Sequence, residues 1–193
     1  MTIPKSALIV IDMQKDGMNM LPPAREVIPA VARLIAACRK HGVHIIYKSR
    51  VHRANGVDVE TFRRELFARN PFLVEGSAGA EIIDELSPRP EDIQVRGTRF
   101  SGFFQTDLQL ILTRLGIERL LICGVQTPNC IRATVTDAIA YDYQVVLASD
   151  AITAKTPEVH AANLADMENM GVTISTTDEI IDALVGCPLS AVE

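Results

Sequence analysis

Short, continuous apolar runs recur along this chain, and amphipathic or polar segments separate them. Runs of this kind are typical of parallel strands buried on both faces of a sheet. The pattern predicts strands over 7–11, 43–47, 93–95, 120–124, 143–148 and 172–175. It predicts helices over 27–40, 107–115, 131–141, 157–170 and 178–184. Strands that alternate with helices indicate an α/β fold, with three layers (α/β/α) around a central, mostly parallel sheet.

The length and composition fit such a fold and exclude several classes of protein. We expect the 193 residues to form one domain, 1–193, with a core of small aliphatic side chains, since aromatics make up only 5%. The net charge of −5 argues against a nucleic-acid partner, which would require a basic face. The sequence shows neither a membrane-spanning apolar segment nor a charged leader, so we expect a cytoplasmic protein without membrane contacts.

Four widely spaced cysteines differ in their local setting. No CxxC pair or Cys/His cluster is present, so we expect thiols rather than a structural zinc site or disulfides. Cys38 and Cys123 fit core positions and Cys187 fits a tail. Cys130 lies where a strand meets the beginning of a helix, and the free amides and dipole at such a place favour a thiolate and would stabilise an oxyanion. The alternative is that Cys130 is a buried, inert thiol.

Two other segments supply candidates at strand ends. Asp12 directly follows the first predicted strand and either acts as a base or caps the next turn. The run 96–104 (RGTRFSGFF) combines cations, glycines and aromatics, and it either lines a pocket or forms a solvated turn. The long segment 49–80, with one or two helical turns near 61–69, is predicted to be a functional loop. Ligands bind at the carboxyl ends of parallel strands, so these residues are expected to converge there.

Four motifs carry a family resemblance across nearly the whole chain. They are ALIVIDMQKD (7–16), GSAGAEIIDEL (76–86), RFSGFFQTDL (99–108) and LLICGVQTPNCIRATVTDA (120–138). With these motifs the chain resembles the isochorismatase-like cysteine hydrolase superfamily. The resemblance implies an Asp–Lys–Cys triad in which Asp12 is the acid and Cys130 the nucleophile. It also implies a non-proline cis peptide at Val125–Gln126, with the amides of Gln126 and Cys130 directed at the oxyanion.

The chain departs from the family pattern at the triad lysine. The family's lysine precedes the aromatic–Ser motif by three or four residues, where this chain has Gly97 and Arg96. We therefore predict that Arg96 supplies the fixed positive charge; the alternatives are that Arg99 does so, or that no residue does and turnover is lost. Four residues from the motifs are predicted to bind substrate: Gln14, Arg99, Phe100 and Phe103.

A second departure concerns metal. Family members that are nicotinamidases bind a metal through an Asp and two His after the second strand, whereas this chain has Arg50 at the Asp position and retains only His52. We therefore expect no metal and no cofactor, and the presence of Cys130 disfavours isochorismate hydrolysis. The sequence thus predicts hydrolysis of a C–N bond in a small amide, ureide or carbamoyl compound through a Cys130 thioester. The family resemblance implies a homodimer or larger homo-oligomer.

Two rival functions follow from the same sequence. Without the family lysine, the protein could be a catalytically impaired member that binds a small molecule or a partner. The βαβ pattern alone would also fit a dinucleotide-dependent oxidoreductase, but residues 11–19 lack the GxGxxG motif that such enzymes carry after the first strand.

Overall fold

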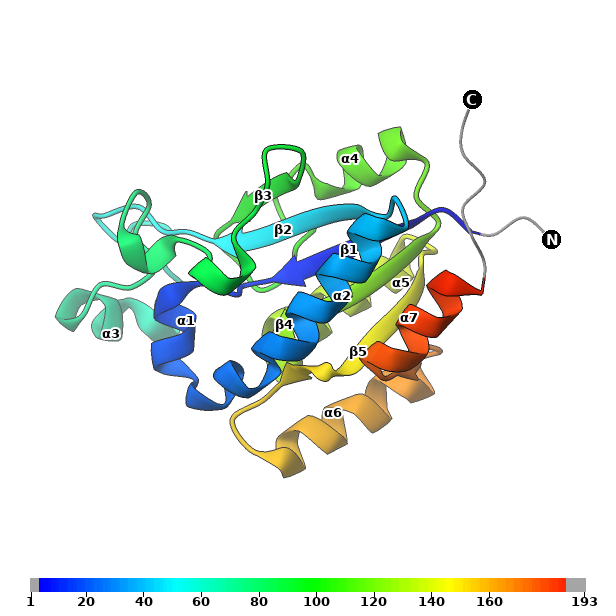
Figure 1. The fold of residues 1–193 in the computed structure, drawn as a ribbon. Helices are drawn as coiled ribbons and strands as arrows, with labels where there is room; N and C mark the ends of the chain where they lie inside the picture. Colours follow the sequence, from blue (N-terminus) through cyan, green and yellow to red (C-terminus); the bar gives the residue numbers. More distant parts are fainter. Residues whose placement is uncertain (1–3, 187–193) are drawn as a thin grey trace.

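The computed structural model describes residues 4–186, and a six-stranded, fully parallel sheet forms its centre (Figure 1). The strand order is β3-β2-β1-β4-β5-β6. The strands are β1 (Ser6–Ile11), β2 (His44–Arg50), β3 (Ile93–Gly97), β4 (Arg119–Val125), β5 (Gln144–Thr153) and β6 (Thr173–Ser175). Residues 7–11 of β1 are completely buried, as expected for a strand covered on both faces.

Helices cover both faces of the sheet and confirm the predicted three-layer α/β/α architecture. The helices are α1 (Lys15–Met20), α2 (Ile28–Lys40), α3 (Arg64–Arg69), α4 (Leu108–Leu115), α5 (Arg132–Ala140), α6 (Pro157–Asn169) and α7 (Thr177–Val185). In Figure 1, α2 and α7 lie in front of the sheet and α4 and α5 lie behind it. No helix within 4–186 is long and apolar enough to span a membrane.

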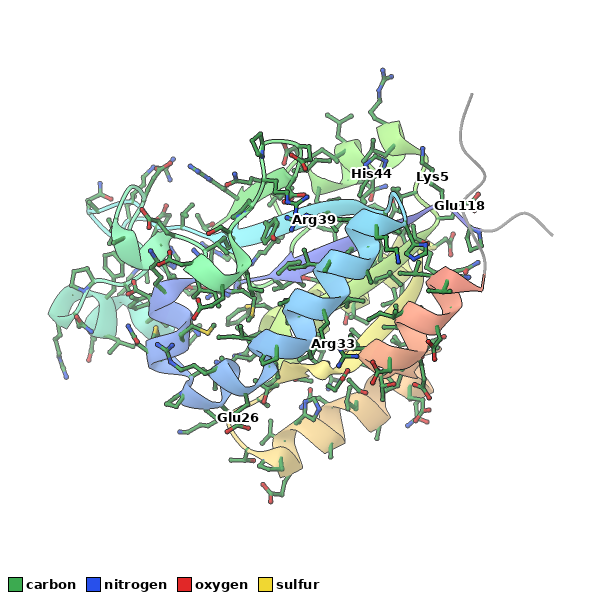
Figure 2. All side chains as sticks on the ribbon, in the orientation of Figure 1. Lys5, Glu26, Arg33, Arg39, His44 and Glu118 are labelled. Atoms are coloured by element: carbon green, nitrogen blue, oxygen red, sulfur yellow. The ribbon has the colours of Figure 1, made fainter. Side chains whose placement is uncertain are left out.

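Local sequence explains why α2 packs where it does. Val31, Leu34 and Cys38 recur at helical spacing and are buried against the sheet. The opposite face carries Arg33, which points toward α7 in Figure 2 and pairs there with Asp178. The helix therefore joins the sheet through its apolar stripe and its neighbouring helix through a surface ion pair.

The strand order creates a crevice between β1 and β4. From β1 the chain moves outward to β2 and β3 on one side, and it then returns to β4 and continues to β5 and β6 on the other. Such a reversal of direction leaves an open crevice at the carboxyl ends of the two central strands. Asp12 follows β1, and Cys130 lies five residues beyond the last residue of β4, Val125, so both lie at this crevice.

Two backbone features hold the end of β1 close to β4. Asp12 has a φ of 51°, a left-handed conformation that Asp tolerates better than most residues. Gly124 on β4 has a φ of 111°, and a Cβ there would lie 2.1 Å from the carbonyl oxygen of Ile11. Only glycine permits this close approach, and the approach fixes the position from which Asp12 projects.

Most predicted elements agree with the observed ones to within a few residues, but two differences affect the site. Strand β2 continues past the apolar run to Arg50, because pairing with β1 and β3 extends through Lys48 and Arg50. The helix predicted over 131–141 begins as a π-helical turn, Thr127–Ile131, before α5. Cys130 therefore lies in an irregular turn and not at a simple helix start. Cys38 and Cys123 are core residues, as predicted, and Cys187 lies outside the described residues.

Candidate active site

A buried ion pair joins the ends of the first two strands. The ammonium of Lys48 lies 2.9 Å from Oδ1 and 3.2 Å from Oδ2 of Asp12. The Lys48 side chain is fully buried, and Asp12 is 8% exposed. Neighbouring parallel strands place them together, since Ile11 pairs with Lys48 in the sheet. The cation next to Asp12 thus comes from β2, and sequence reasoning did not identify Lys48.

Cys130 opens onto the same crevice and is 6% exposed. The pKa of its thiol is raised to about 12, chiefly by burial and next by the nearby Asp12 carboxylate, while Lys48 and Arg50 partly oppose this rise. The expectation that a helix N-terminus lowers this pKa is wrong, because desolvation outweighs the nearby positive charges. Cys130 is therefore a neutral thiol at rest, and it shares its cavity with the Asp12 carboxylate.

Arg50 is the second cation that the sequence did not assign to the site. Its Nη2 donates to the Cys130 Sγ at 3.2 Å, and its Nη1 lies 3.2 Å from Oε1 of Glu60. The Arg50 guanidinium carbon also lies 4.5 Å from the centre of the Phe100 ring. Arg50 is 2% exposed, so a carboxylate, a sulfur and an aromatic face surround a charge that water barely reaches.

Gln14 fixes the backbone of Arg50. Its Nε2 donates to the Arg50 carbonyl at 2.8 Å, and its Oε1 accepts from the Arg50 amide at 2.9 Å. The same Nε2 donates to the Ala80 carbonyl at 2.7 Å. Gln14 lies at the site, as predicted, but its amide group is engaged by the backbone, which makes it a positioning residue for Arg50.

The motif RFSGFF contacts the turn that contains Cys130. Thr134, four residues after Cys130, donates to the Cys130 carbonyl at 2.7 Å and accepts from the Gly102 amide at 2.9 Å. Ser101 donates to Asp137 of α5. The Arg99 carbonyl accepts from Lys48 Nζ at 3.2 Å. These contacts explain the Cys-x-x-x-Thr spacing, because Thr134 connects the turn that contains Cys130 to the loop beside it.

Three of the predicted site residues do not direct their side chains into the crevice. The prediction that Arg96 supplies the positive charge of the site is wrong. Arg96 alternates with the buried Val95 and Gly97 on β3, so its side chain points outward, and its exposed guanidinium lies 3.8 Å from Glu75. Arg99 turns its side chain to the loop and donates to the Asp58 carbonyl at 2.7 Å. Phe103 packs against Tyr141 and Tyr143 instead.

The crevice encloses a cavity of about 60 Å³. The Val125–Gln126 peptide bond is cis, as predicted, and both residues line this cavity. Polar and charged lining residues are Asp12, Gln14, Arg50, Arg63, Gln126, Asn129 and Cys130, with Phe100 and Leu73 among the apolar ones. Of the predicted residues, the structure thus brings together Asp12, Gln14, Phe100, Val125, Gln126 and Cys130.

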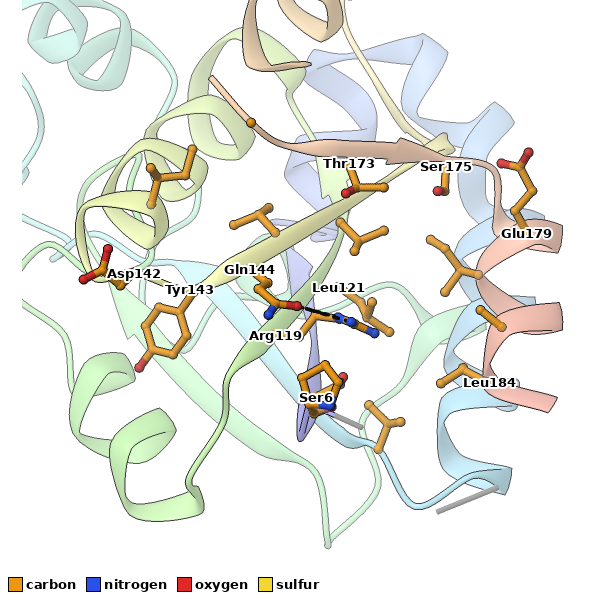
Figure 3. A pocket seen from close by; sticks show the side chains of 18 of the residues that line it. Ser6, Arg119, Leu121, Asp142, Tyr143, Gln144, Thr173, Ser175, Glu179 and Leu184 are labelled. Carbon is orange, nitrogen blue, oxygen red and sulfur yellow. Dashed lines mark hydrogen bonds between the residues drawn. The ribbon is translucent and has the colours of Figure 1, made fainter. Parts of the chain in front are cut away.

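A larger cavity of about 1160 Å³ lies at the other end of the sheet (Figure 3). It borders the amino ends of β1, β4 and β5, where Arg119 hydrogen-bonds Gln144, and it reaches β6 and α7. Its described lining contains no cysteine, histidine or lysine. We therefore place the candidate active site in the small cavity, where Cys130 and the buried charges are.

The residues near Arg50 do not fit a metal ion. The guanidinium already contacts Glu60 and Cys130, and His52 lies 3.8 Å from Asp58 with both ring nitrogens buried and unpartnered. Burial lowers the pKa of His52. Within 4–186, no cluster of three or more His, Cys, Asp or Glu side chains has a metal-binding arrangement. A fixed cation at Arg50 repels a dication from this place.

Fold and site together define a parallel α/β/α protein with a cysteine, a carboxylate and a lysine at its switch point. The family model of the isochorismatase domain matches residues 6–179, and the chain belongs to this family.

Curated relatives and solved structures agree with this assignment. An Arabidopsis thaliana protein described as a probable inactive nicotinamidase is 42% identical and covers 90% of this chain and 93% of its own. The ureidoacrylate amidohydrolase RutB of Variovorax paradoxus is 30% identical, covering 91% of this chain and 80% of its own. An isochorismatase family protein from Desulfovibrio vulgaris superposes with a TM-score of 0.90 at 38% identity, covering 95% of this chain and 100% of its own.

Proposed function

We propose that this protein is a cysteine amidohydrolase that cleaves the C–N bond of a small amide, ureide or carbamoyl compound. The observation that carries the proposal is the placement of Asp12, buried against Lys48 at 2.9 Å, in the same cavity as the Cys130 thiol. A nucleophile, a base and a group that orients the base are what acyl transfer requires. The named activity of the RutB relative supports amide chemistry.

In the first half-reaction, the Cys130 sulfur attacks the amide carbonyl while its proton moves to Asp12. A thiol with a pKa of about 12 transfers its proton during attack rather than before it, so the base must be adjacent. Asp12 then protonates the leaving nitrogen, the C–N bond breaks, and a thioester remains on Cys130.

In the second half-reaction, water attacks the thioester and gives a proton to Asp12. The C–S bond breaks, the carboxylic acid leaves, and the sulfur regains its proton from Asp12. Lys48 holds the carboxylate in place throughout, since its ammonium has no polar partners among the described residues other than Asp12 and the Arg99 carbonyl.

Arg50 stabilises the charge that develops on sulfur in both steps. Its Nη2 is 3.2 Å from Sγ, and a guanidinium stays protonated at any physiological pH. This role needs a fixed positive charge and no proton transfer, so an arginine can fill it. Arg50 stands at the position where the metal-dependent family members have an acidic metal ligand. The reaction is accordingly proposed to proceed without metal.

The test is ammonia release from a panel of primary amides, ureides and carbamoyl compounds. We expect turnover by the native protein, none by Cys130→Ala, and a decrease of roughly 10²–10⁴ in Asp12→Asn. Asp84→Asn, which alters an exposed carboxylate, is the matched control and should retain full activity. Undiminished turnover in Cys130→Ala would refute the proposal. The absence of turnover on the whole panel would favour the rival binding function, to which the probable inactivity described for the Arabidopsis relative lends support.

A further inference from the structure

The cavity contains one cation that the proposed chemistry does not use. Arg63 ends the 3₁₀ turn Thr61–Arg63 before α3 and lines the cavity together with Arg50 and Cys130. The segment 49–80, which contains Arg63, thus contributes to the site, as its length predicted.

Carboxylates neutralise the other two cations of the site but not Arg63. Lys48 pairs with Asp12, and Arg50 pairs with Glu60. Among residues 4–186, the Arg63 guanidinium has no hydrogen bond and no ion pair within 4.0 Å. It lies instead over aromatic rings, 5.2 Å from the centre of Phe62, 5.3 Å from Phe100 and 6.0 Å from Phe72.

The surroundings of Arg63 leave its charge incompletely compensated. Burial and the nearby Arg50 lower the pKa of Arg63, although Glu60, Cys130 and Asp12 partly oppose this effect. A guanidinium has five N–H donors in a planar fork that matches a carboxylate, and stacking on rings leaves these donors free. A half-buried, positive and unpaired fork next to the nucleophile is therefore suited to an anion.

We propose that Arg63 binds a carboxylate of the substrate, so that this site selects amides or carbamoyl compounds bearing a second, anionic group. This inference rests on the proposed amide hydrolysis for its scissile bond, but the anion site itself is testable without turnover. The uncharged carbonyl would face Cys130, and the carboxylate would lie toward Arg63.

The size of the cavity adds a requirement for movement. About 60 Å³ is far below the roughly 300–1,000 Å³ of pockets that enclose a small ligand, so this cavity is too small for such a substrate. Arg63 lines the cavity from the 3₁₀ turn, and among residues 4–186 only ring contacts hold its guanidinium. A carboxylate that draws Arg63 off these rings would open the cavity while it binds.

The first experiment measures protection of Cys130 against iodoacetamide by succinate, a dicarboxylate without a scissile bond. Succinate should slow alkylation of the native protein, and about 10- to 100-fold more succinate should be needed in Arg63→Met. Arg63→Lys keeps the charge without the fork and should give an intermediate value. Arg64→Met, which alters the exposed neighbour, is the matched control and should behave like the native protein. Equal protection in Arg63→Met and Arg64→Met would overturn the inference.

The second experiment compares hydrolysis of succinamate with that of butyramide, which has the same chain length but no charge. Arg63→Met should lower kcat/KM about 10- to 100-fold for succinamate and leave butyramide nearly unchanged. An equal loss for both amides would show that Arg63 only holds the loop, and the inference would fail. Hydrolysis of both amides without an anion preference refutes the carboxylate site alone, whereas Arg63-dependent protection by succinate without any amide turnover refutes the proposed function alone.

Discussion

Replacing Lys48 by methionine should destabilise this protein strongly, because it leaves a nearly buried carboxylate without its cation. Lys48 is fully buried and its nitrogen contacts both oxygens of Asp12 and the Arg99 carbonyl. Removing one partner of a buried ion pair typically costs about 3–5 kcal/mol. For a chain of this length, that loss corresponds to a decrease in Tm of roughly 6–20 °C.

The assay is urea unfolding at pH 7, with the free energy of unfolding extrapolated to water. The double variant Lys48→Met, Asp12→Asn should recover most of the loss, since it also removes the orphaned charge. Lys15→Met is the control: its salt bridges to Glu81 and Asp84 lie at the surface, where solvent screens them, so stability should hardly change. A Lys48→Met variant within about 1 kcal/mol of the native protein would contradict the assignment of Lys48 as the buried counter-charge.

Four further outcomes follow from the site. The rate of Cys130 alkylation by iodoacetamide should rise with pH toward the thiol pKa of about 12. Asp12→Asn should shift this pH profile to lower pH, because it removes a carboxylate that raises the pKa, and Arg50→Met should shift it to higher pH, because it removes a cation that lowers the pKa. An unchanged profile in both variants would contradict these electrostatic effects on Cys130. Gly124→Ala should lower the free energy of unfolding in urea by about 3 kcal/mol or more, because a Cβ would clash with the backbone of Ile11. Gly116 has a φ of 63° and open space around it, so Gly116→Ala should lower this free energy by only about 1–2 kcal/mol. Arg96→Met should leave both amide turnover and the Cys130 alkylation profile unchanged, and a shifted profile would restore Arg96 to the site. Dialysis against a chelator should leave Tm and turnover unchanged, and metal-dependent recovery of activity would contradict the proposed role of Arg50.

The sequence was sufficient to predict the sheet, the crevice and two of its residues. Fully buried strands such as β1 and β4 appear as continuous apolar runs, and the residues that follow them, Asp12 and Cys130, must lie at the carboxyl edge of a parallel sheet. The cis peptide at Val125–Gln126 was implied by the family resemblance that the motif around Cys130 carries.

The two cations could not be found by the same reasoning. Strand β2 continues beyond its apolar run, and a lysine and an arginine that follow such a run resemble the beginning of a solvated loop. Their burial depends on carboxylates distant in sequence, Asp12 for Lys48 and Glu60 for Arg50. The register of β1 against β2, which pairs Ile11 with Lys48, was the missing information.

Arg96 illustrates a different limit. Its position after a predicted strand gave the correct end of the sheet, but the face to which a strand residue points alternates with every residue. Val95 and Gly97 are buried, so Arg96 between them faces outward to Glu75. Similarly, the desolvation that raises the pKa of Cys130 depends on the packing of the whole crevice, which no local motif encodes.

The proposed mechanism requires that Cys130 form a covalent acyl intermediate with an amide substrate. Rapid acid quenching of the native protein during turnover, followed by intact-mass measurement and peptide mapping, tests it directly. We expect a mass increase equal to the acyl group, located on the peptide that contains Cys130 and absent from Asp12→Asn at the same early times. Sustained turnover with an unmodified Cys130 peptide, or an acyl group on a different residue, would contradict it.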